Sequence, residues 1–282
     1  MTFGEYHREM IQVLLKAGCE SPAFDARCLL ESCAGVPRGE LPLWRDRQLP
    51  EEARRTVANA VRQRAEGRPL QYIVGEWDFL NLTLEVGEGV LIPRPDTELL
   101  CETAAAHLQK AYAGAPVRAL DLCAGSGCVG LGIASLYPAA QVTAVELSDA
   151  AFSYLTRNCR RYPCFQIVPM RGDVFADAAS FGGGWQAILS NPPYIPSEDL
   201  SALSREVKRE PPMALDGGDG LRFYRVIAEK WVPQLDKGGF CAVEVGIGQA
   251  YAVAAIWKTV GLRDVAIYPD LAGIDRVVAG VR

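Results

Sequence analysis

The sequence lacks several features that would place it in common classes of protein. It contains only two histidines, and its nine cysteines show no Cys-X-X-Cys spacing of a zinc site. No apolar run is long enough to cross a membrane, and the first residues lack the apolar stretch of a signal peptide. We therefore expect a soluble, cytoplasmic protein with free thiols, no bound metal and no membrane association.

The chain also lacks an excess of basic residues. Its net charge is −5, and residues 1–72 hold 11 Lys and Arg against 10 Asp and Glu, so the acidic excess lies in the remainder. Proteins that grip long nucleic acids usually present a basic surface, so we expect no stable nucleic-acid binding, and we expect a monomer. A local arginine cluster is typical of a solvated helix face: Arg54, Arg55, Arg62, Arg64 and Arg68.

The hydrophobic pattern changes along the 282 residues, which exceed the usual size of one domain. Residues 1–72 have helical spacing interrupted by Gly and Pro, which predicts a small all-helical domain. We assign this domain to substrate recognition. Residues 73–92 alternate around Leu80-Asn81 and predict a β-hairpin linker. Residues 93–282 would then form the catalytic domain, which opens with a helix that Asp96 caps and that runs to about residue 112.

From residue 117 apolar strands alternate with helices. The expected strands are 117–122, 141–146, 165–168, 186–190, 239–245, 264–268 and 275–280, and the expected helices are 128–137, 149–161, 220–235 and 248–260. This alternation predicts an α/β fold with a doubly wound, Rossmann-like sheet. The irregular stretch 192–219 is long enough to indicate a functional lid.

A glycine-containing turn follows the first expected strand. The segment Asp121-Leu122-Cys123-Ala124-Gly125-Ser126-Gly127 opens a helix, and its glycines let the backbone approach a ligand closely. Glu146 ends the second strand, where its carboxylate suits a ribose diol. Asp173 follows the third strand and suits an adenine amino group, with Val174 as an apolar wall. These residues predict a nucleoside site at the carboxyl edge of the sheet.

The same turn also fits a dinucleotide fingerprint. Residues 125–130 satisfy Gly-X-Gly-X-X-Gly, and Glu146 lies about 20 residues further on. We favour an adenosyl sulfonium ligand, because Asp121 would repel a pyrophosphate but suits a cationic amino-acid end. Asp173 adds the adenine contact, and a hydride-transfer enzyme would need a proton-transfer group that the two poorly placed histidines do not supply.

Asn191-Pro192-Pro193-Tyr194 directly follows the fourth apolar strand. An NH2 group on an sp2 carbon is a weak nucleophile, so a site that methylates it must hold both N–H bonds and aim the lone pair at the methyl donor. The side-chain oxygen of Asn191 and the carbonyl of Pro192 supply two acceptors, and Tyr194 offers a flat face to a planar target. Asn191, Pro192 and Tyr194 are the candidate catalytic residues, and Pro193 completes the candidate substrate site.

Taken together, these motifs resemble class I methyltransferases that use S-adenosylmethionine to modify exocyclic or amide nitrogens. Residues 91–98, Leu-Ile-Pro-Arg-Pro-Asp-Thr-Glu, and residues 210–215, Glu-Pro-Pro-Met-Ala-Leu, with Asp219-Gly220-Leu221, are similar to the HemK/PrmC-type release factor glutamine methyltransferases. The resemblance covers about residues 70–282. It implies transfer of a methyl group to the side-chain nitrogen N5 of the glutamine in the Gly-Gly-Gln motif of peptide chain release factors, with S-adenosylhomocysteine as the second product.

The resemblance also implies roles for individual residues. The cofactor would be held by Asp121, Cys123, Ala124, Gly125, Ser126, Gly127, Glu146, Asp173, Val174 and Asn191, and the glutamine amide by Asn191, Pro192, Pro193 and Tyr194. Two positions depart from the family pattern. Cys123 stands where glycine is common, and Arg209 precedes Glu210-Pro211 where an aromatic residue is usual.

Two alternatives remain from the sequence. A nucleic-acid methyltransferase acting on adenine N6 or guanine N2 would use the same tetrapeptide, but it would need a basic groove. A catalytically silent binding module with the same fold would fail to bind S-adenosylmethionine.

Overall fold

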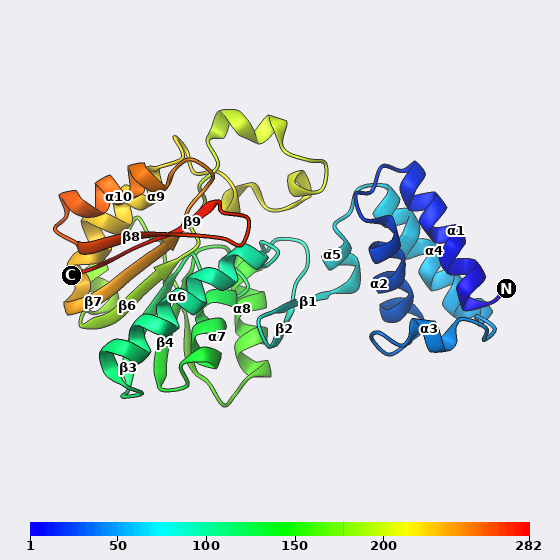
Figure 1. Cartoon of the computed structure of the whole chain (residues 1–282), viewed down its shortest axis with the longest axis horizontal. Helices are drawn as coiled ribbons and strands as arrows, with labels where there is room; N and C mark the ends of the chain where they lie inside the picture. Colours follow the sequence, from blue (N-terminus) through cyan, green and yellow to red (C-terminus); the bar gives the residue numbers. More distant parts are fainter. Residues whose placement is uncertain (177) are drawn as a thin grey trace. The chain divides into compact units, whose positions relative to one another are not determined.

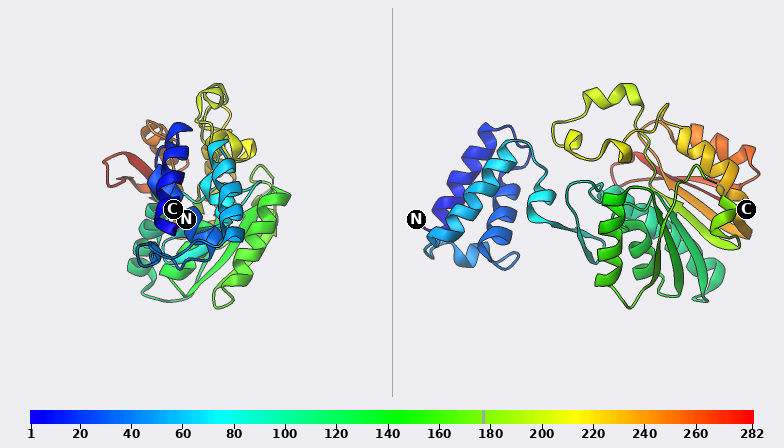
Figure 2. Two further views of the ribbon diagram at one scale, coloured as in Figure 1. Left: turned by 90° about the vertical axis from the view of Figure 1, so that its right-hand side faces the viewer. Right: turned by 180° about the vertical axis from the view of Figure 1, so that it is seen from behind.

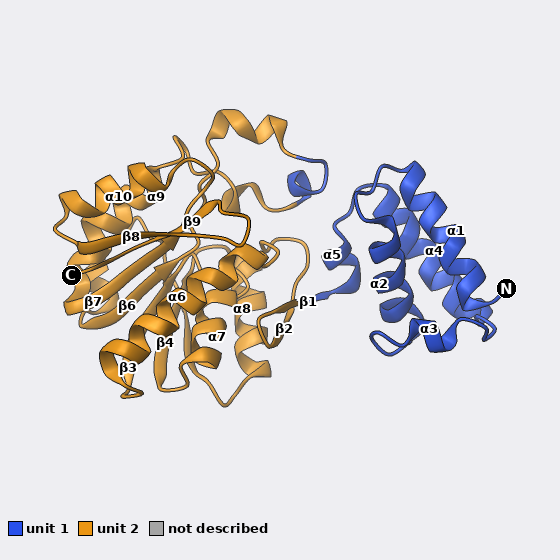
Figure 3. Ribbon diagram, in the orientation of Figure 1, with its two compact units in different colours: residues 1–77, 204–209 blue, residues 78–203, 210–282 orange. Residues whose placement is uncertain are grey.

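The computed structural model describes residues 1–176 and 178–282 and divides the chain into two compact units. Unit 1 comprises Met1–Trp77 and Ser204–Arg209, and unit 2 comprises Asp78–Leu203 and Glu210–Arg282 (Figure 3). This division differs from the expected domain boundaries at 72 and 92, and it adds a short segment from the second half of the chain to the first unit. Within the described ranges, no helix is both long and apolar enough to span a bilayer.

Unit 1 is a small helical bundle. Its helices are α1 (Phe3–Lys16), α2 (Pro22–Ala34), α3 (Leu41–Trp44), α4 (Glu51–Ala65) and α5 (Leu70–Val74). A reciprocal capping box between Thr2 and Glu5 starts α1, and Gly35, with a φ of 67°, ends α2. Met10, Leu14 and their apolar neighbours pack into one core, as the helical spacing predicts.

A buried ion-pair cluster holds the segment Ser204–Arg209 in unit 1. Arg64 donates to Asp25 across 2.6 Å and pairs with Glu206 across 2.7 Å, and the side chains of Arg64 and Asp25 are each only 5% exposed. Arg205 adds a hydrogen bond to the carbonyl of Ala65 at 2.9 Å. The expectation of a solvated arginine face is therefore wrong for Arg64, because two carboxylates neutralise its charge inside the bundle.

The hairpin around Leu80 and Asn81 is confirmed. β1 (Glu76–Phe79) and β2 (Leu82–Glu85) form a two-stranded sheet, and Leu80 takes the turn with a φ of 53°.

The main sheet of unit 2 has seven strands in the order β5-β4-β3-β6-β7-β9-β8 (Figure 1). They are β3 (Val117–Leu122), β4 (Ala140–Glu146), β5 (Gln166–Arg171), β6 (Trp185–Ser190), β7 (Leu235–Glu244), β8 (Arg263–Pro269) and β9 (Asp275–Val281). The first five run parallel, and β9 is antiparallel to both β7 and β8. Each expected strand is present. The order reverses beside β3, which places a ligand crevice at the carboxyl ends of β3, β4 and β6.

Helices cover both faces of this sheet (Figures 1 and 2). α6 (Pro95–Tyr112), α7 (Cys128–Leu136) and α8 (Asp149–Arg161) lie on one face, and α9 (Arg222–Val226) and α10 (Ala250–Thr259) lie on the other. Successive strand residues alternate between two cores, with Ala119 and Leu189 on one side and Leu120 and Ile188 on the other. This two-sided burial produces the continuous apolar runs seen in the sequence.

Two helix predictions need correction. The single helix expected at 220–235 is α9 followed by a π-helical turn, Ile227–Trp231, and a 3-10 turn, Val232–Gln234. Asp96 does not cap α6, because Pro95 already occupies the first helical position and Arg94 the N-cap. Asp96 instead pairs with Arg276 on β9 at 3.0 Å.

Between β6 and α9 the chain forms short 3-10 helices at Ser197–Ala202, Val207–Arg209 and Pro212–Ala214.

Candidate active site

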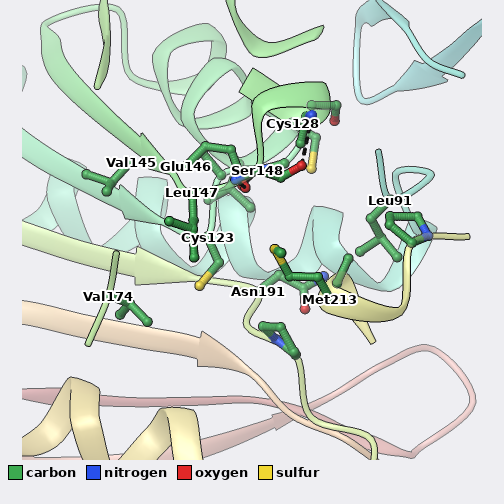
Figure 4. Close-up of a pocket in the computed structure, with 18 of the residues that line it drawn as sticks. Leu91, Cys123, Cys128, Val145, Glu146, Leu147, Ser148, Val174, Asn191 and Met213 are labelled. Atoms are coloured by element: carbon green, nitrogen blue, oxygen red, sulfur yellow. Dashed lines mark hydrogen bonds between the residues drawn. The ribbon is translucent and has the colours of Figure 1, made fainter. Parts of the chain in front are cut away.

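A cavity at the carboxyl edge of the sheet collects most of the predicted site residues (Figure 4). Its lining includes Cys123, Ala124, Gly125, Ser126, Glu146, Asp173, Val174, Asn191 and Pro193. Four further predicted residues are not part of this lining: Asp121, Gly127, Pro192 and Tyr194. All of these residues belong to unit 2.

The turn after β3 leaves open space where a side chain would project. Gly125 has a φ of 57°, and a Cβ added there would meet no atom of residues 1–176 or 178–282 within 4 Å. Gly127 serves as the N-cap of α7 with a φ of 85°, and a Cβ there would lie 2.7 Å from Leu155. The first glycine therefore gives a ligand access to the backbone, and the second allows the helix to start against α8.

Glu146 closes the turn from the neighbouring strand. Its Oε2 accepts from the backbone N–H of Gly125 at 2.8 Å, and its Oε1 accepts from the N–H of Ser148 at 2.7 Å. The side chain is 8% exposed and lines the cavity. Each carboxylate oxygen has a further lone pair, so Glu146 can hold the turn and accept from two neighbouring hydroxyl groups together.

Asp121 lies behind the turn. Its Oδ2 accepts from the N–H of Gly130 in α7 at 2.9 Å, while its Oδ1 is buried and has no hydrogen-bond partner among the described residues. Burial raises the pKa of Asp121 to about 8, against the lowering effect of the Gly130 hydrogen bond. Asp121 therefore contacts the start of α7 in this structure, and direct contact between Asp121 and a cofactor stays a prediction.

Cys123 adopts a left-handed conformation with a φ of 59°. This conformation explains why glycine is common at the equivalent position of the family that the motifs resemble. Burial raises the pKa of the Cys123 thiol well above its ordinary value, so the thiol stays protonated and contributes to the cavity wall.

An aromatic wall completes the proposed adenine region. Asp173 accepts from the backbone N–H of Phe175 at 2.9 Å, which orients its carboxylate next to Val174. Phe175 meets Phe223 of α9 edge to face, with ring centroids 5.0 Å apart, and both line the cavity. Sequence reasoning missed both rings, and the aromatic residue directly after Asp173-Val174 was the available signal for the first.

The Asn-Pro-Pro-Tyr segment is held at several points. The side-chain amide nitrogen of Asn191 donates to the hydroxyl of Thr97 at 3.0 Å. Gln249 donates to the carbonyl of Tyr194 at 2.8 Å, and the phenol of Tyr194 donates to Glu244 at 3.4 Å. A Cβ on Gly217 would lie 2.9 Å from the carbonyl oxygen of Pro193, so only glycine fits there. The segment is therefore fixed before any substrate arrives.

Two sequence stretches singled out above meet beside this segment. Glu210 is 3% exposed, accepts from the backbone N–H of Ile92 at 3.0 Å and forms an ion pair with Arg94. Leu91, Pro93 and Met213 from the same stretches line the cavity. Arg209, the second departure, lies in unit 1, where it donates to the carbonyl of Glu66 at 3.4 Å.

Thr97 and Glu244 are the main polar residues that sequence reasoning missed. Thr97 lines the cavity and is fully buried, and Glu244 ends β7 and is 1% exposed. Burial raises the pKa of Glu244 to about 7, although hydrogen bonds from Thr97 and Tyr194 lower it. The position of Glu244 at the end of an apolar strand was the one signal available.

The chemistry of the lining fits an adenosyl group that carries positive charge. Open backbone at Gly125, the paired acceptors of Glu146, the carboxylate of Asp173 and the rings of Phe175 and Phe223 match a ribose, an adenine and a cationic end. Burial raises the pKa of Asp121 to about 8, so its carboxyl keeps a proton at neutral pH and does not supply the negative charge expected from the sequence. Glu146 and Asp173 instead offer acceptors beside the turn, whereas a pyrophosphate needs donors.

Comparisons with known proteins agree with this chemistry. Residues 5–75 match the family model "PrmC N-terminal domain", and residues 70–217 match the model "Conserved hypothetical protein 95". The chain is 39% identical over 269 residues to the release factor glutamine methyltransferase of Geobacter sulfurreducens, covering 95% of this chain and 92% of the relative. It is 34% identical to that of Moorella thermoacetica, covering 100% and 99%.

Solved structures are similar as well. A release factor-specific protein-(glutamine-N5) methyltransferase from Alicyclobacillus acidocaldarius is 36% identical, with a TM-score of 0.44 over 70% of this chain and 98% of that chain. The hMettl16 catalytic domain, solved in complex with a MAT2A 3'UTR hairpin, has a TM-score of 0.55 at 15% identity, covering 79% of this chain and 81% of that chain. The second likeness concerns the fold alone.

Proposed function

The chain belongs to the release factor glutamine methyltransferase family, and on that premise we propose how its cavity carries out the reaction. The enzyme transfers a methyl group from S-adenosylmethionine to the side-chain nitrogen N5 of a release factor glutamine, within the Gly-Gly-Gln motif. The cofactor supplies an electrophilic methyl group on a sulfonium centre. The residues of this chain bind, orient and shield the two reactants.

The cofactor is assigned to the turn and strand ends that line the cavity. Glu146 would accept from the ribose hydroxyls, and Asp173 would accept from the adenine amino group beside Val174 and the ring of Phe175. The open backbone at Gly125 would take the amino-acid end. The paired acceptance of backbone N–H groups by Glu146 supports this assignment, because it fixes both oxygens in place.

The glutamine amide is assigned to the Asn-Pro-Pro-Tyr segment. Its two N–H groups donate to the side-chain oxygen of Asn191 and to the carbonyl of Pro192, with the amide plane against Tyr194. When bound, the cofactor would supply the methyl carbon that the N5 lone pair attacks, and the electron pair of the broken carbon–sulfur bond would stay on sulfur. The proton leaves N5 for water. Orientation supplies the acceleration, so no strong base is required.

One observation carries this proposal. Asn191 lines the same cavity as Glu146, and its amide nitrogen is occupied by Thr97, which leaves its oxygen for a donor in the cavity.

The test is methyl transfer to a purified release factor with labelled cofactor, beside a copy whose glutamine is replaced by alanine. We expect label on the first protein alone. Asn191→Ala should lower kcat by about a hundredfold or more, the usual cost of removing one transition-state contact, while cofactor affinity persists. Asn81→Ala in the exposed hairpin turn is the matched control and should behave like wild type. Near-normal kcat in Asn191→Ala would reject the assigned role.

The remaining assignments concern partners and place of action. We propose that the helical unit recognises the body of the release factor, and that the enzyme acts as a cytoplasmic monomer without holding nucleic acid. The acidic net charge supports the absence of nucleic-acid binding. The relatives named release factor glutamine methyltransferase give no support to the alternative of a nucleic-acid methyltransferase. Light scattering and salt-dependent RNA-binding assays test these statements directly.

A further inference from the structure

A buried carboxylate stands two hydrogen bonds behind the proposed amide site. Glu244 at the end of β7 contacts the hydroxyl of Thr97 through Oε2 and the phenol of Tyr194 through Oε1. Thr97 in turn accepts from the amide nitrogen of Asn191 at 3.0 Å. The contact between Thr97 and Glu244 joins residues 147 positions apart and is buried. A continuous chain of polar groups therefore runs from Glu244 through Thr97 to Asn191.

The protons in this chain can point in one direction only while Glu244 is ionised. An ionised carboxylate accepts but cannot donate, so the single hydroxyl proton of Thr97 must point at Glu244. The lone pairs of the Thr97 hydroxyl oxygen then face Asn191 and require a donor. The NH2 group of Asn191 can donate to them. If the Asn191 amide were flipped, its oxygen would lie against the Thr97 oxygen and no hydrogen bond would form. The carboxylate thus dictates which end of the Asn191 amide faces the cavity.

We propose that Thr97 and Glu244 are positioning residues that lock the side-chain amide of Asn191 with its oxygen toward the reacting nitrogen. The inference rests on the proposed function for the meaning of that oxygen, but the orientation itself is a property of the free protein. Neither residue touches substrate in this account. Their role is to prevent the amide from flipping, which would present two donors to a group that also donates.

Glu244 interacts electrostatically with several other charged or titratable groups. They are Asp96 of α6, Arg276 of β9, Tyr194, Tyr224 and the thiols of Cys101 and Cys128. Arg276 forms ion pairs with Asp96 at 3.0 Å and with Asp270 at 3.1 Å, so its positive charge is not available to Glu244 alone. Protonation of Glu244 makes it a donor, and the enforced direction is then lost. We expect kcat to fall as the pH drops through about 7, the raised pKa of this group.

The direct test observes Asn191 without any substrate. Selective ¹⁵N labelling of the chain's four asparagines gives four side-chain NH2 signals, and Asn191→Ala identifies the relevant pair. In wild type this pair should exchange slowly with water and shift with pH around the ionisation of Glu244. Thr97→Val should abolish both properties, and Thr97→Ser should restore them. Thr156→Val is the matched control, because the hydroxyl of Thr156 donates to a carbonyl of its own helix, that of Phe152.

The kinetic test uses the same variants with the release factor. Thr97→Val should lower kcat about tenfold, the effect of one hydrogen bond, with little change in cofactor affinity, and Thr97→Ser should recover most of it. Glu244→Gln should flatten the acid side of the pH profile. If Thr97→Val proves unstable on heating, Thr97→Ala replaces it in both tests.

The outcomes separate the two ideas. An Asn191 signal unchanged in Thr97→Val overturns the positioning role, whatever the activity of the enzyme. The second informative outcome combines two results: the slow exchange and pH shift of the Asn191 signal are lost in Thr97→Val, and the wild-type enzyme leaves the release factor unmethylated. The first result supports the positioning role, and the second rejects the proposed substrate.

Discussion

Glu146→Gln is the most informative change at the proposed cofactor site. Glu146 uses one oxygen for the N–H of Gly125 and the other for the N–H of Ser148. Glutamine keeps the shape of the side chain but offers one acceptor oxygen and one NH2 group. One backbone N–H must then face another donor, and the ribose loses one charged acceptor.

The size of the effect follows from these contacts. A hydrogen bond to a charged group is worth about 1.5–3 kcal/mol, and the 8% exposure of Glu146 leaves little screening by water. Since about 1.4 kcal/mol corresponds to a tenfold change, the Kd for cofactor should rise roughly 10- to 150-fold. Disturbance of the turn should also lower the free energy of unfolding by about 1–3 kcal/mol.

Isothermal titration with S-adenosylhomocysteine measures the Kd, and urea denaturation measures the free energy of unfolding. Glu85→Gln is the matched control. Glu85 pairs with Arg157 at 2.7 Å, but both side chains are about 40% exposed, so its replacement should alter Kd less than threefold. A folded Glu146→Gln protein whose Kd stays within threefold of wild type would show that Glu146 does not hold the ribose.

Two further predictions concern stability. Burial raises the pKa of Asp121 to about 8. Between about pH 4 and pH 8 the folded chain therefore keeps a proton that the unfolded chain has lost. The free energy of unfolding should fall as the pH rises through that window. Asp121→Asn should remove this part of the pH dependence, and parallel slopes for the variant and wild type in melts from pH 4 to pH 8 would contradict the assignment. Arg64→Met leaves the buried carboxyl of Asp25 in unit 1 without its ion-pair partner, so it should cost about 3–5 kcal/mol in urea denaturation. Arg55→Met, whose side chain is 79% exposed, is the control, and equal losses in the two variants would refute a buried role for Arg64.

The sequence predicts the strands well because each is an apolar run bounded by polar turns. It does not predict the direction of β9, since side chains alternate with the same period in parallel and antiparallel strands. The π-helical turn at Ile227–Trp231 was also out of reach, because its apolar residues continue the helical spacing of α9.

The same limit applies to the site. Residues at strand ends, such as Glu146 and Asn191, can be placed because parallel strands end at one edge of the sheet. Thr97 and Glu244 lie 147 positions apart in the sequence and meet because α6 packs on β7 and its antiparallel neighbour β9. A contact of this kind leaves no local pattern in the sequence. Arg64 looked exposed for a similar reason, as its second carboxylate, Glu206, follows much later in the chain.

The assignment of Ser204–Arg209 to unit 1 means that the chain passes between the two units three times, after residues 77, 203 and 209. A truncated enzyme that starts at residue 78 would keep this segment but lose Asp25, Arg64 and the carbonyl of Ala65, its partners in the bundle. The stretch that leads away from Tyr194 would then be anchored only by its own half of the molecule. Removing the amino-terminal helices would therefore also remove an anchor of the loop that follows the proposed amide site, so activity lost on truncation would not by itself measure recognition by those helices.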